Sequence, residues 1–458
     1  MSETLVSVGV DVGTTTTQLI VSELTVQNQA SSFAVPQMQI TERKIRYRSP
    51  VYFTPLLGQE LVDGAAIRQL VAGAYDQAQI SRGDVDTGAI IITGETSRKE
   101  NAQAVLAALS DFAGDFVVAT AGPDLESVLA AKGAGAVEFS AVSGKTLLHM
   151  DIGGGTSNLA LIADGKVVQT GCLNVGGRLI KQDKNGRIAY VSPVLCGLTD
   201  LQEGMYPEPA QVEAVAQILA HALEMAAGLR EPTGLLEKLT TRQTVTKWQI
   251  PTENVVISFS GGVADCIETE HEPQAFGDIG PVLGQAIAKS RLCQGEYMLG
   301  KQTIRATVIG AGCHSAQLSG STVFSSGVSL PVKNLPVAVF TKQEQDSAQF
   351  PQLIRQRILQ KDTDKVVLAL PGDPSPTYQK VDALAESIAA GAPEHGVYVC
   401  LQADMAKALG HRLKLKLPNG TPILCIDSVH LRDESFLDVG AQVGPAMPVV
   451  IKTLILSQ

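Results

Sequence analysis

Apolar residues near the start of the chain fall into two short runs that are separated by a polar glycine turn. The first run ends at Asp11, and the second, at residues 18–21, is too short and too rich in β-branched side chains for a helix. We therefore predict a β-hairpin around Gly13. The same layout returns from residue 146, where a strand ends at Asp151 and a second hairpin follows. The repetition predicts two related halves.

Helical spacing and short strand-like runs predict the remaining elements. Apolar positions three or four residues apart predict helices at 65–78 and 210–227. Stretches rich in small residues predict helices at 101–109 and 124–136, and a further helix is expected at 279–288. Alternating or continuous apolar runs predict strands at 43–48, 89–92, 116–119, 255–259 and 307–312. Beyond residue 319, strand-like runs alternate with helical stretches, and residues 341–349 are the expected hinge loop. We expect an α/β protein with units at residues 1–140, 141–320 and 321–458.

The composition is that of a large acidic protein. The 458 residues carry a formal net charge of -10, and 45% of them are hydrophobic. The negative charge argues against binding to nucleic acid or to an anionic membrane surface, and no apolar run is long enough to cross a bilayer. The seven cysteines are scattered and never spaced as Cys-x-x-Cys, which predicts reduced thiols in the cytoplasm and no zinc or iron–sulfur site. The oligomeric state is left open.

Two stretches combine aspartate, glycine and hydroxyl side chains directly after a strand. The first comprises Asp11, Gly13, Thr14 and Thr15, and the second comprises Asp151, Gly153, Gly154, Gly155 and Thr156. Glycine lets backbone N–H groups approach phosphate oxygens, and aspartate supplies an oxygen ligand for Mg²⁺ or its water shell. The chain has neither a P-loop motif nor a dinucleotide-binding fingerprint. With a third glycine turn at Gly261 and Gly262, the pattern predicts binding of ATP with Mg²⁺.

These turns resemble those of the actin–hexokinase–heat-shock-chaperone superfamily of ATPases. The resemblance implies two ribonuclease H-like lobes with ATP between them. It places Asp11 and Asp151 at the metal, and the glycines and threonines that follow each aspartate at the β- and γ-phosphates. Gly261 and Gly262 correspond to the adenosine turn. Gly310, in a stretch that looks like the second of two interdomain helices, joins the expected nucleotide-binding set.

The same resemblance suggests two catalytic candidates. Glu126 stands at the start of the stretch that looks like the first interdomain helix, where the chaperone branch places a glutamate that positions Mg²⁺ or the attacking water. Glu95 follows a predicted buried strand and is the second candidate. Each also has a purely structural interpretation, Glu126 as a carboxylate favoured by the helix dipole and Glu95 as a turn residue.

Longer sequence motifs indicate which member family of the superfamily the chain resembles. They lie at residues 93–102, 121–127, 306–312, 317–320 and 448–454. Together they look like ethanolamine ammonia-lyase reactivating factors over essentially the whole chain. That family implies a chaperone-like ATPase, which uses ATP and Mg²⁺ to release damaged cobalamin from inactivated ethanolamine ammonia-lyase so that adenosylcobalamin can rebind. The resemblance also implies a cytoplasmic protein of ethanolamine catabolism and leaves open an association with a bacterial microcompartment.

Other functions within the superfamily stay open. A small-molecule kinase would need a general base directed at a hydroxyl group, and a filament-forming ATPase would polymerise with nucleotide. An activator of radical dehydratases would need a cluster-binding cysteine, for which Cys172 and Cys196 stand nearest to the second turn, although plain buried or loop thiols are the simpler interpretation. The third unit is expected to dock the lyase or to tune closure of the lobes.

Overall fold

The structure is a computed structural model. It describes residues 2–13, 16–28, 38–57, 61–93, 117–120, 123–241, 255–300, 303–314, 316–320, 322–361, 363, 365–392, 395–431, 435–442 and 446–453. Three predicted site residues, Thr14, Thr15 and Glu95, lie outside these segments, as does the predicted helix at 101–109. In the described part of the chain, no helix has both the length and the apolar character that a membrane span requires.

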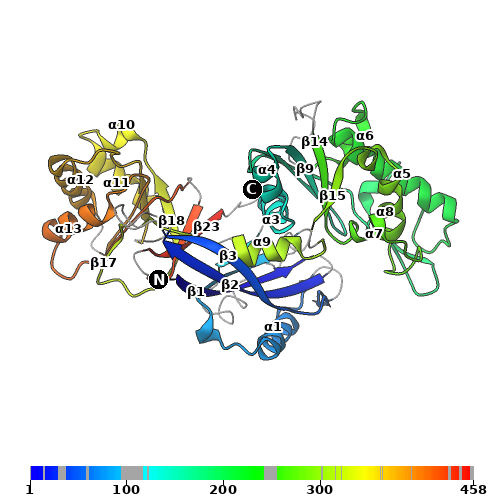
Figure 1. Ribbon diagram of the computed structural model, residues 1–458, viewed down its shortest axis with the longest axis horizontal. Coiled ribbons are helices and arrows are strands. Elements are labelled where there is room, and N and C mark those ends of the chain that lie inside the picture. Colours follow the sequence, from blue (N-terminus) through cyan, green and yellow to red (C-terminus); the bar gives the residue numbers. More distant parts are fainter. Residues whose placement is uncertain are drawn as a thin grey trace.

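Two sheets with the same strand order form the first two lobes (Figure 1). The first sheet runs in the order β3 (Met38–Arg48), β2 (Thr16–Asn28), β1 (Ser2–Val12), β7 (Thr87–Ile92) and β8 (Val117–Thr120). The second runs in the order β11 (Lys166–Leu173), β10 (Ser157–Ala163), β9 (Thr146–Ile152), β14 (Val255–Ser260) and β15 (Tyr297–Leu299). In each sheet the first three strands are antiparallel and the last three are parallel. This repeated order confirms the two ribonuclease H-like lobes.

Amphipathic helices bury one face against each sheet. In the first lobe, α1 (Gly64–Ala78) packs Ile67 and Val71 into the same core as Val8 of β1. In the second lobe, α5 (Pro209–Ala226) and α8 (Gly280–Ala288) share a core with β9 and β14. Shorter elements complete the lobes: β4 (Tyr52–Phe53), β5 (Leu56–Leu57), β6 (Leu61–Val62), α4 (Ala136–Ser143), β12 (Ile180–Gln182), β13 (Ile188–Val191), α6 (Gly234–Leu239) and α7 (Asp265–Glu268).

Two helices, α3 (Pro123–Gly133) and α9 (Ala306–His314), pack on each other between the lobes (Figure 1). A Cβ atom on Gly133 would lie 1.9 Å from the carbonyl oxygen of Ala306, and one on Gly310 would lie 2.0 Å from that of Leu129. Only glycine allows so close an approach of two backbones. Because α3 also packs on the second sheet and α9 on the first, this contact ties the two lobes together.

The predicted strand at 307–312 is wrong, because these residues belong to α9. A short run of apolar and small residues fits either a buried strand or a buried helix, and periodicity alone does not separate them. The interdomain helix implied by the family resemblance is the structure observed there.

The third unit is built on an eight-stranded sheet in the order β16-β23-β22-β18-β19-β20-β21-β17. Its strands are β16 (Ala316–Leu318), β17 (Phe324–Ser326), β18 (Val332–Val339), β19 (Val367–Leu370), β20 (Val397–Leu401), β21 (Ile423–Asp427), β22 (Ser435–Val439) and β23 (Pro448–Thr453). Strands β18 to β21 are parallel, and they share a core with α11 (Phe350–Leu359), α12 (Tyr378–Gly391) and α13 (Ala406–Lys416). The alternation predicted beyond residue 319 is therefore an α/β unit.

The third unit shares part of its core with the first lobe. Val450 of β23 packs in one cluster with Ala89 and Ile91 of β7. Leu318 of β16 packs against a cluster that includes Leu24 of β2. Figure 1 shows this unit and the second lobe on opposite sides of the first lobe. The third unit therefore covers apolar residues of the first lobe.

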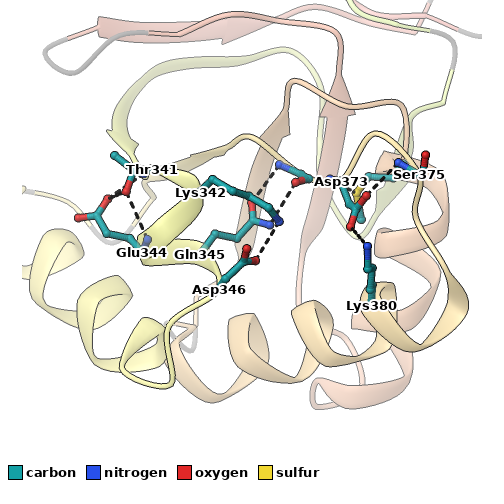
Figure 2. A network of polar contacts seen from close by, with 10 residues as sticks. Thr341, Lys342, Glu344, Gln345, Asp346, Asp373, Ser375 and Lys380 are labelled. Carbon is teal, nitrogen blue, oxygen red and sulfur yellow. Dashed lines mark hydrogen bonds and ion pairs between the residues drawn. The ribbon is translucent and has the colours of Figure 1, made fainter.

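The expected hinge at residues 341–349 contains a capped helix instead, α10 (Lys342–Gln345) (Figure 2). The N–H group of Thr341 donates to Glu344 Oε2 at 2.7 Å, and the N–H group of Glu344 donates to Thr341 Oγ1 at 3.3 Å. The buried Gln345 accepts a 2.9 Å hydrogen bond from the N–H group of Gly372. The prediction of a loop is wrong for residues 342–345, because Thr341 and Glu344 form a capping box that starts a short helix.

The glycine contact between α3 and α9 can be tested with a matched pair of variants. Gly310→Ala should destabilise the protein by about 1–3 kcal/mol, because the new methyl group meets the backbone of Leu129. Gly73→Ala is the control, since no heavy atom lies within 4 Å of a Cβ at this position inside α1, and it should be neutral or stabilise by up to about 1 kcal/mol. Urea unfolding curves measure both effects. Equal stability of the two variants would contradict the close contact.

Candidate functional site

A cavity of about 590 Å³ lies between the two lobes, and most of the predicted site residues form its wall. They are Asp11, Gly13, Glu126, Asp151, Gly153, Gly154, Gly155, Thr156, Gly261 and Gly262. Gly310 does not belong to the wall formed by the described residues; it lies against Leu129 of α3. The structure shows Gly310 in the helix contact, and its predicted place at the nucleotide stays a prediction. The folded chain brings residues from both halves of the sequence to one site.

The two aspartates precede turns that are closed in the same way. The N–H group of Gly13 donates to the carbonyl oxygen of Thr16 at 2.9 Å, and the N–H group of Gly153 donates to that of Thr156 at 2.9 Å. Both turns connect an antiparallel strand pair that lies next to a parallel strand. Two equivalent hairpin tips thus line the cavity from opposite lobes.

The backbone of the second turn is held by a loop after β11 that the sequence prediction missed. The N–H groups of Gly177 and Arg178 donate to the carbonyl oxygens of Gly153 and Gly154 at 3.1 and 2.6 Å. In a trans peptide the N–H group points away from the carbonyl group. The N–H groups of Gly154 and Gly155 therefore lie on the side of the turn opposite to this loop. Both residues line the cavity, and such N–H groups suit phosphate oxygens.

Hydroxyl groups from neighbouring elements hold the two carboxylates. Thr93 Oγ1 donates to Asp11 Oδ1 at 2.8 Å, Ser260 Oγ donates to Asp151 Oδ1, and Thr307 Oγ1 donates to Asp151 Oδ2 at 3.3 Å. Burial of Asp11 raises its pKa to about 7, and the charge of Asp151 adds to this increase. The hydrogen bond from Thr93 lowers the pKa but does not offset the effect of burial. Burial raises the pKa of Asp151 as well. A cation bound near both carboxylates would lower their pKa values again, because it favours the ionised form.

Two amide side chains that the sequence prediction missed stand beside the aspartates. Gln18 is the cross-strand neighbour of Asp11, and Asn158 is that of Asp151. Both are buried and line the cavity, and neither Gln18 Oε1 nor Asn158 Oδ1 has a hydrogen-bond partner among the described residues. Because an unpaired buried oxygen is unfavourable, both sites suit a donor such as metal-bound water. The sequence signal is the spacing, since each amide follows its aspartate by seven residues.

Glu126 is buried in the first turn of α3 and reaches the same end of the cavity. Its Oε2 atom accepts a 2.6 Å hydrogen bond from Asn158 Nδ2. The amide of Asn158 thus fixes the carboxylate through its nitrogen, while its oxygen has no partner among the described residues. Glu126 thus lines the cavity beside Asn158, and its catalytic role stays a prediction.

The predicted adenosine turn packs on the strand that carries Asp151. Gly261 has a φ of 90°, and a Cβ there would lie 2.3 Å from the carbonyl oxygen of Ile152, so both the conformation and the space require glycine. The N–H group of Val263 donates to the same oxygen at 3.2 Å. Gly262 lines the cavity beside it. A contact with adenosine at this turn stays a prediction.

Most of the charged side chains among the described residues that line the cavity are acidic. Its carboxylates are Asp11, Glu126, Asp151, Asp265 and Asp278. Among the described lining residues Arg178 is the one cation, and its Nε atom pairs with Asp278 Oδ2 at 3.1 Å. A cation would reduce the repulsion between these carboxylates and a polyphosphate. No group of three or more His, Cys, Asp or Glu side chains in the described chain could hold a metal alone, but Mg²⁺ commonly takes one or two carboxylates with phosphate oxygens and water.

Comparison with known proteins reveals relatives over nearly the full length of the chain. It is 39% identical over 475 aligned positions to the ethanolamine ammonia-lyase reactivase EutA of Salmonella typhimurium (strain LT2) and 38% identical over 471 to that of Escherichia coli (strain K12); each alignment covers 98% of both chains. Among solved structures, the PPX-GPPA enzyme of Aquifex aeolicus matches 67% of this chain and 99% of its own at 13% identity and a TM-score of 0.41. A family model described as ethanolamine utilisation protein EutA matches residues 3–457. The chain belongs to the ethanolamine utilisation protein EutA family.

Proposed function

We propose that this protein is an ATP-dependent reactivase of ethanolamine ammonia-lyase. The observation that carries the proposal is the convergence of two Asp-Gly turns, one from each lobe, on one acidic cavity. Two relatives that match nearly the whole chain bear the name ethanolamine ammonia-lyase reactivase. The cavity supports the ATPase half of the proposal, and the relatives support the choice of lyase.

Different residues of the cavity have different roles in ATP binding and hydrolysis. Asp11 and Asp151 would hold Mg²⁺, which would supply positive charge to offset the charge of the phosphates. The N–H groups of Gly154 and Gly155 hold phosphate oxygens and stabilise the charge that develops on them. Glu126, fixed by Asn158, orients the attacking water.

A nucleotide can act on the lyase only if it changes the affinity of another surface. Thr307, in the first turn of α9, donates to Asp151, and the chain after α9 enters β16 of the third sheet. One helix thus leads from the cavity to the third unit. We assign lyase docking to the third unit and the release of damaged cobalamin to the nucleotide cycle. The proposed setting is the cytoplasm, in association with the ethanolamine-utilisation microcompartment.

Removing either metal carboxylate should stop the ATPase. Asp11→Ala and Asp151→Ala should each lower Mg²⁺-dependent ATP turnover by about 100-fold or more, because each removes charge from the reaction centre. Asp76→Ala is the control, since Asp76 is exposed on α1, and it should keep wild-type turnover. Phosphate release measures turnover, and circular dichroism checks the fold. Normal turnover in a folded Asp11 or Asp151 variant would contradict the two-turn site.

The reactivase assignment has its own assay. Ethanolamine ammonia-lyase that holds a cobalamin without its adenosyl group should regain deamination activity when this protein, Mg²⁺, ATP and adenosylcobalamin are added together. Asp151→Ala should fail to restore activity, and Asp76→Ala should succeed. Equal recovery with and without ATP would contradict the proposal, and a phosphorylated small-molecule product would instead indicate a kinase.

The raised pKa of Asp11 predicts a pH dependence of folding. The pKa is about 7 in the folded protein and 3.8 for an ordinary aspartate, so the folded state keeps a proton that the unfolded chain releases. The free energy of unfolding should therefore decrease as pH rises through this interval. Asp11→Asn should flatten that part of the slope. Urea unfolding between about pH 5 and pH 8, without nucleotide or Mg²⁺, measures it, and identical slopes for both proteins would contradict the shift.

A further inference from the structure

We propose that His149 is a positioning residue for Asp151, because it orients the hydroxyl group of Ser260 so that the hydroxyl proton points at the Asp151 carboxylate. The inference rests on the proposed function, which gives Asp151 a metal to hold. His149 is not one of the described residues that line the cavity. Its influence on the site therefore passes through Ser260.

The imidazole lies between two hydroxyl groups on the neighbouring strand. In the parallel register of β9 and β14, His149 is paired with Ser258, and Asp151 is paired with Ser260. His149 Nδ1 lies 2.6 Å from Ser258 Oγ, and Nε2 lies 2.9 Å from Ser260 Oγ. Ser260 Oγ is in turn hydrogen-bonded to Asp151 Oδ1. All four side chains are at least nine-tenths buried.

The chemistry of these groups sets the direction of every hydrogen bond. An ionised carboxylate only accepts, so the single proton of Ser260 Oγ goes to Asp151. Ser260 Oγ must then accept from His149 Nε2, which carries a proton. In a neutral imidazole Nδ1 is the acceptor, and it receives the proton of Ser258. The hydrogen bonds from His149 Nε2 to Ser260 Oγ and from Ser260 Oγ to Asp151 Oδ1 therefore both point toward the carboxylate.

Among the described residues, the first lobe has no histidine in the position that corresponds to His149. The residue two positions before Asp11 is Gly9, where a Cβ would lie 2.6 Å from the carbonyl oxygen of Val308. The backbone of α9 covers that position and excludes a side chain. Asp11 takes its hydroxyl donor from Thr93 instead. The hydrogen-bonded series of His149, Ser260 and Asp151 therefore has no counterpart at Gly9 in the first lobe.

Ser260 also begins the predicted adenosine turn. Gly261 follows it and packs on the carbonyl group of Ile152, so Ser260 joins the turn to the metal carboxylate. Without the imidazole, the Ser260 hydroxyl group could rotate, and Asp151 would lose a directed donor. Outer hydrogen-bond partners of this kind commonly change metal affinity by about 10–100-fold.

Two polar substitutions separate positioning from packing. His149→Gln can place an amide N–H group near the position of Nε2 and keep the donor to Ser260. His149→Asn is shorter, so it can serve Ser258 but does not reach Ser260. Mn²⁺ binding, followed by electron paramagnetic resonance with a non-hydrolysable ATP analogue, should weaken about 10-fold or more in His149→Asn and stay near wild type in His149→Gln.

A control and a second variant complete the test. Leu148→Ala alters the fully buried neighbour on the same strand, and it should lower the unfolding temperature without weakening Mn²⁺ binding. Ser260→Ala should weaken binding as much as His149→Asn, and the double variant should bind no more weakly than either single variant. This second variant keeps the test valid if the histidine variants do not fold.

Three other results of the Mn²⁺ binding experiment would contradict the inference. Wild-type Mn²⁺ affinity in folded His149→Asn or in Ser260→Ala would overturn the inference while the nucleotide site stands. Equal weakening in the glutamine and asparagine variants would overturn it as well, since it would show a packing role. A wild-type protein that binds no Mn²⁺ with the ATP analogue would overturn both the inference and the proposed function.

Discussion

Two carboxylates that face one cavity from different lobes are the constraint on which the rest of the structure depends. Asp11 and Asp151 both have a raised pKa because they are buried, and the charge of Asp151 adds to the shift of Asp11. Hydroxyl groups hold them, whereas the guanidinium of Arg178 on the described wall pairs with Asp278. The fold therefore leaves part of this negative charge for an incoming cation to compensate. That is a physical reason for metal and nucleotide to bind together.

The contact of α3 and α9 determines how a change at this site can spread. The helices touch through Gly133 and Gly310, with no side chains between their backbones at these points, so one cannot shift far without the other. Each helix also packs on one of the two sheets. Thr307 joins α9 to Asp151, and Val450 joins the third unit to the core of the first lobe. These contacts connect the cavity, α9 and the third unit, and the proposed effect of the nucleotide on the third unit would pass through them.

The parts of the site that repeat locally could be predicted from the sequence. Asp11 and Asp151 each bring a glycine turn within a few residues, and the strand order of the two lobes agrees with that duplication. Gln18 and Asn158 were missed because their positions beside the aspartates depend on cross-strand register. The contact of Gly310 could not be predicted either, because its partner Leu129 lies 181 residues earlier in the chain.

The central claim is that Asp11 and Asp151 hold one metal ion together with the phosphates of ATP. The most direct measurement is a crystal structure with Mn²⁺ and a non-hydrolysable ATP analogue, in which anomalous scattering locates the metal. We predict one Mn²⁺ peak in the cavity between the two carboxylates, with the phosphates at the Gly153 turn. A nucleotide bound in the cavity with its metal away from both carboxylates, or a nucleotide bound elsewhere, would contradict the account.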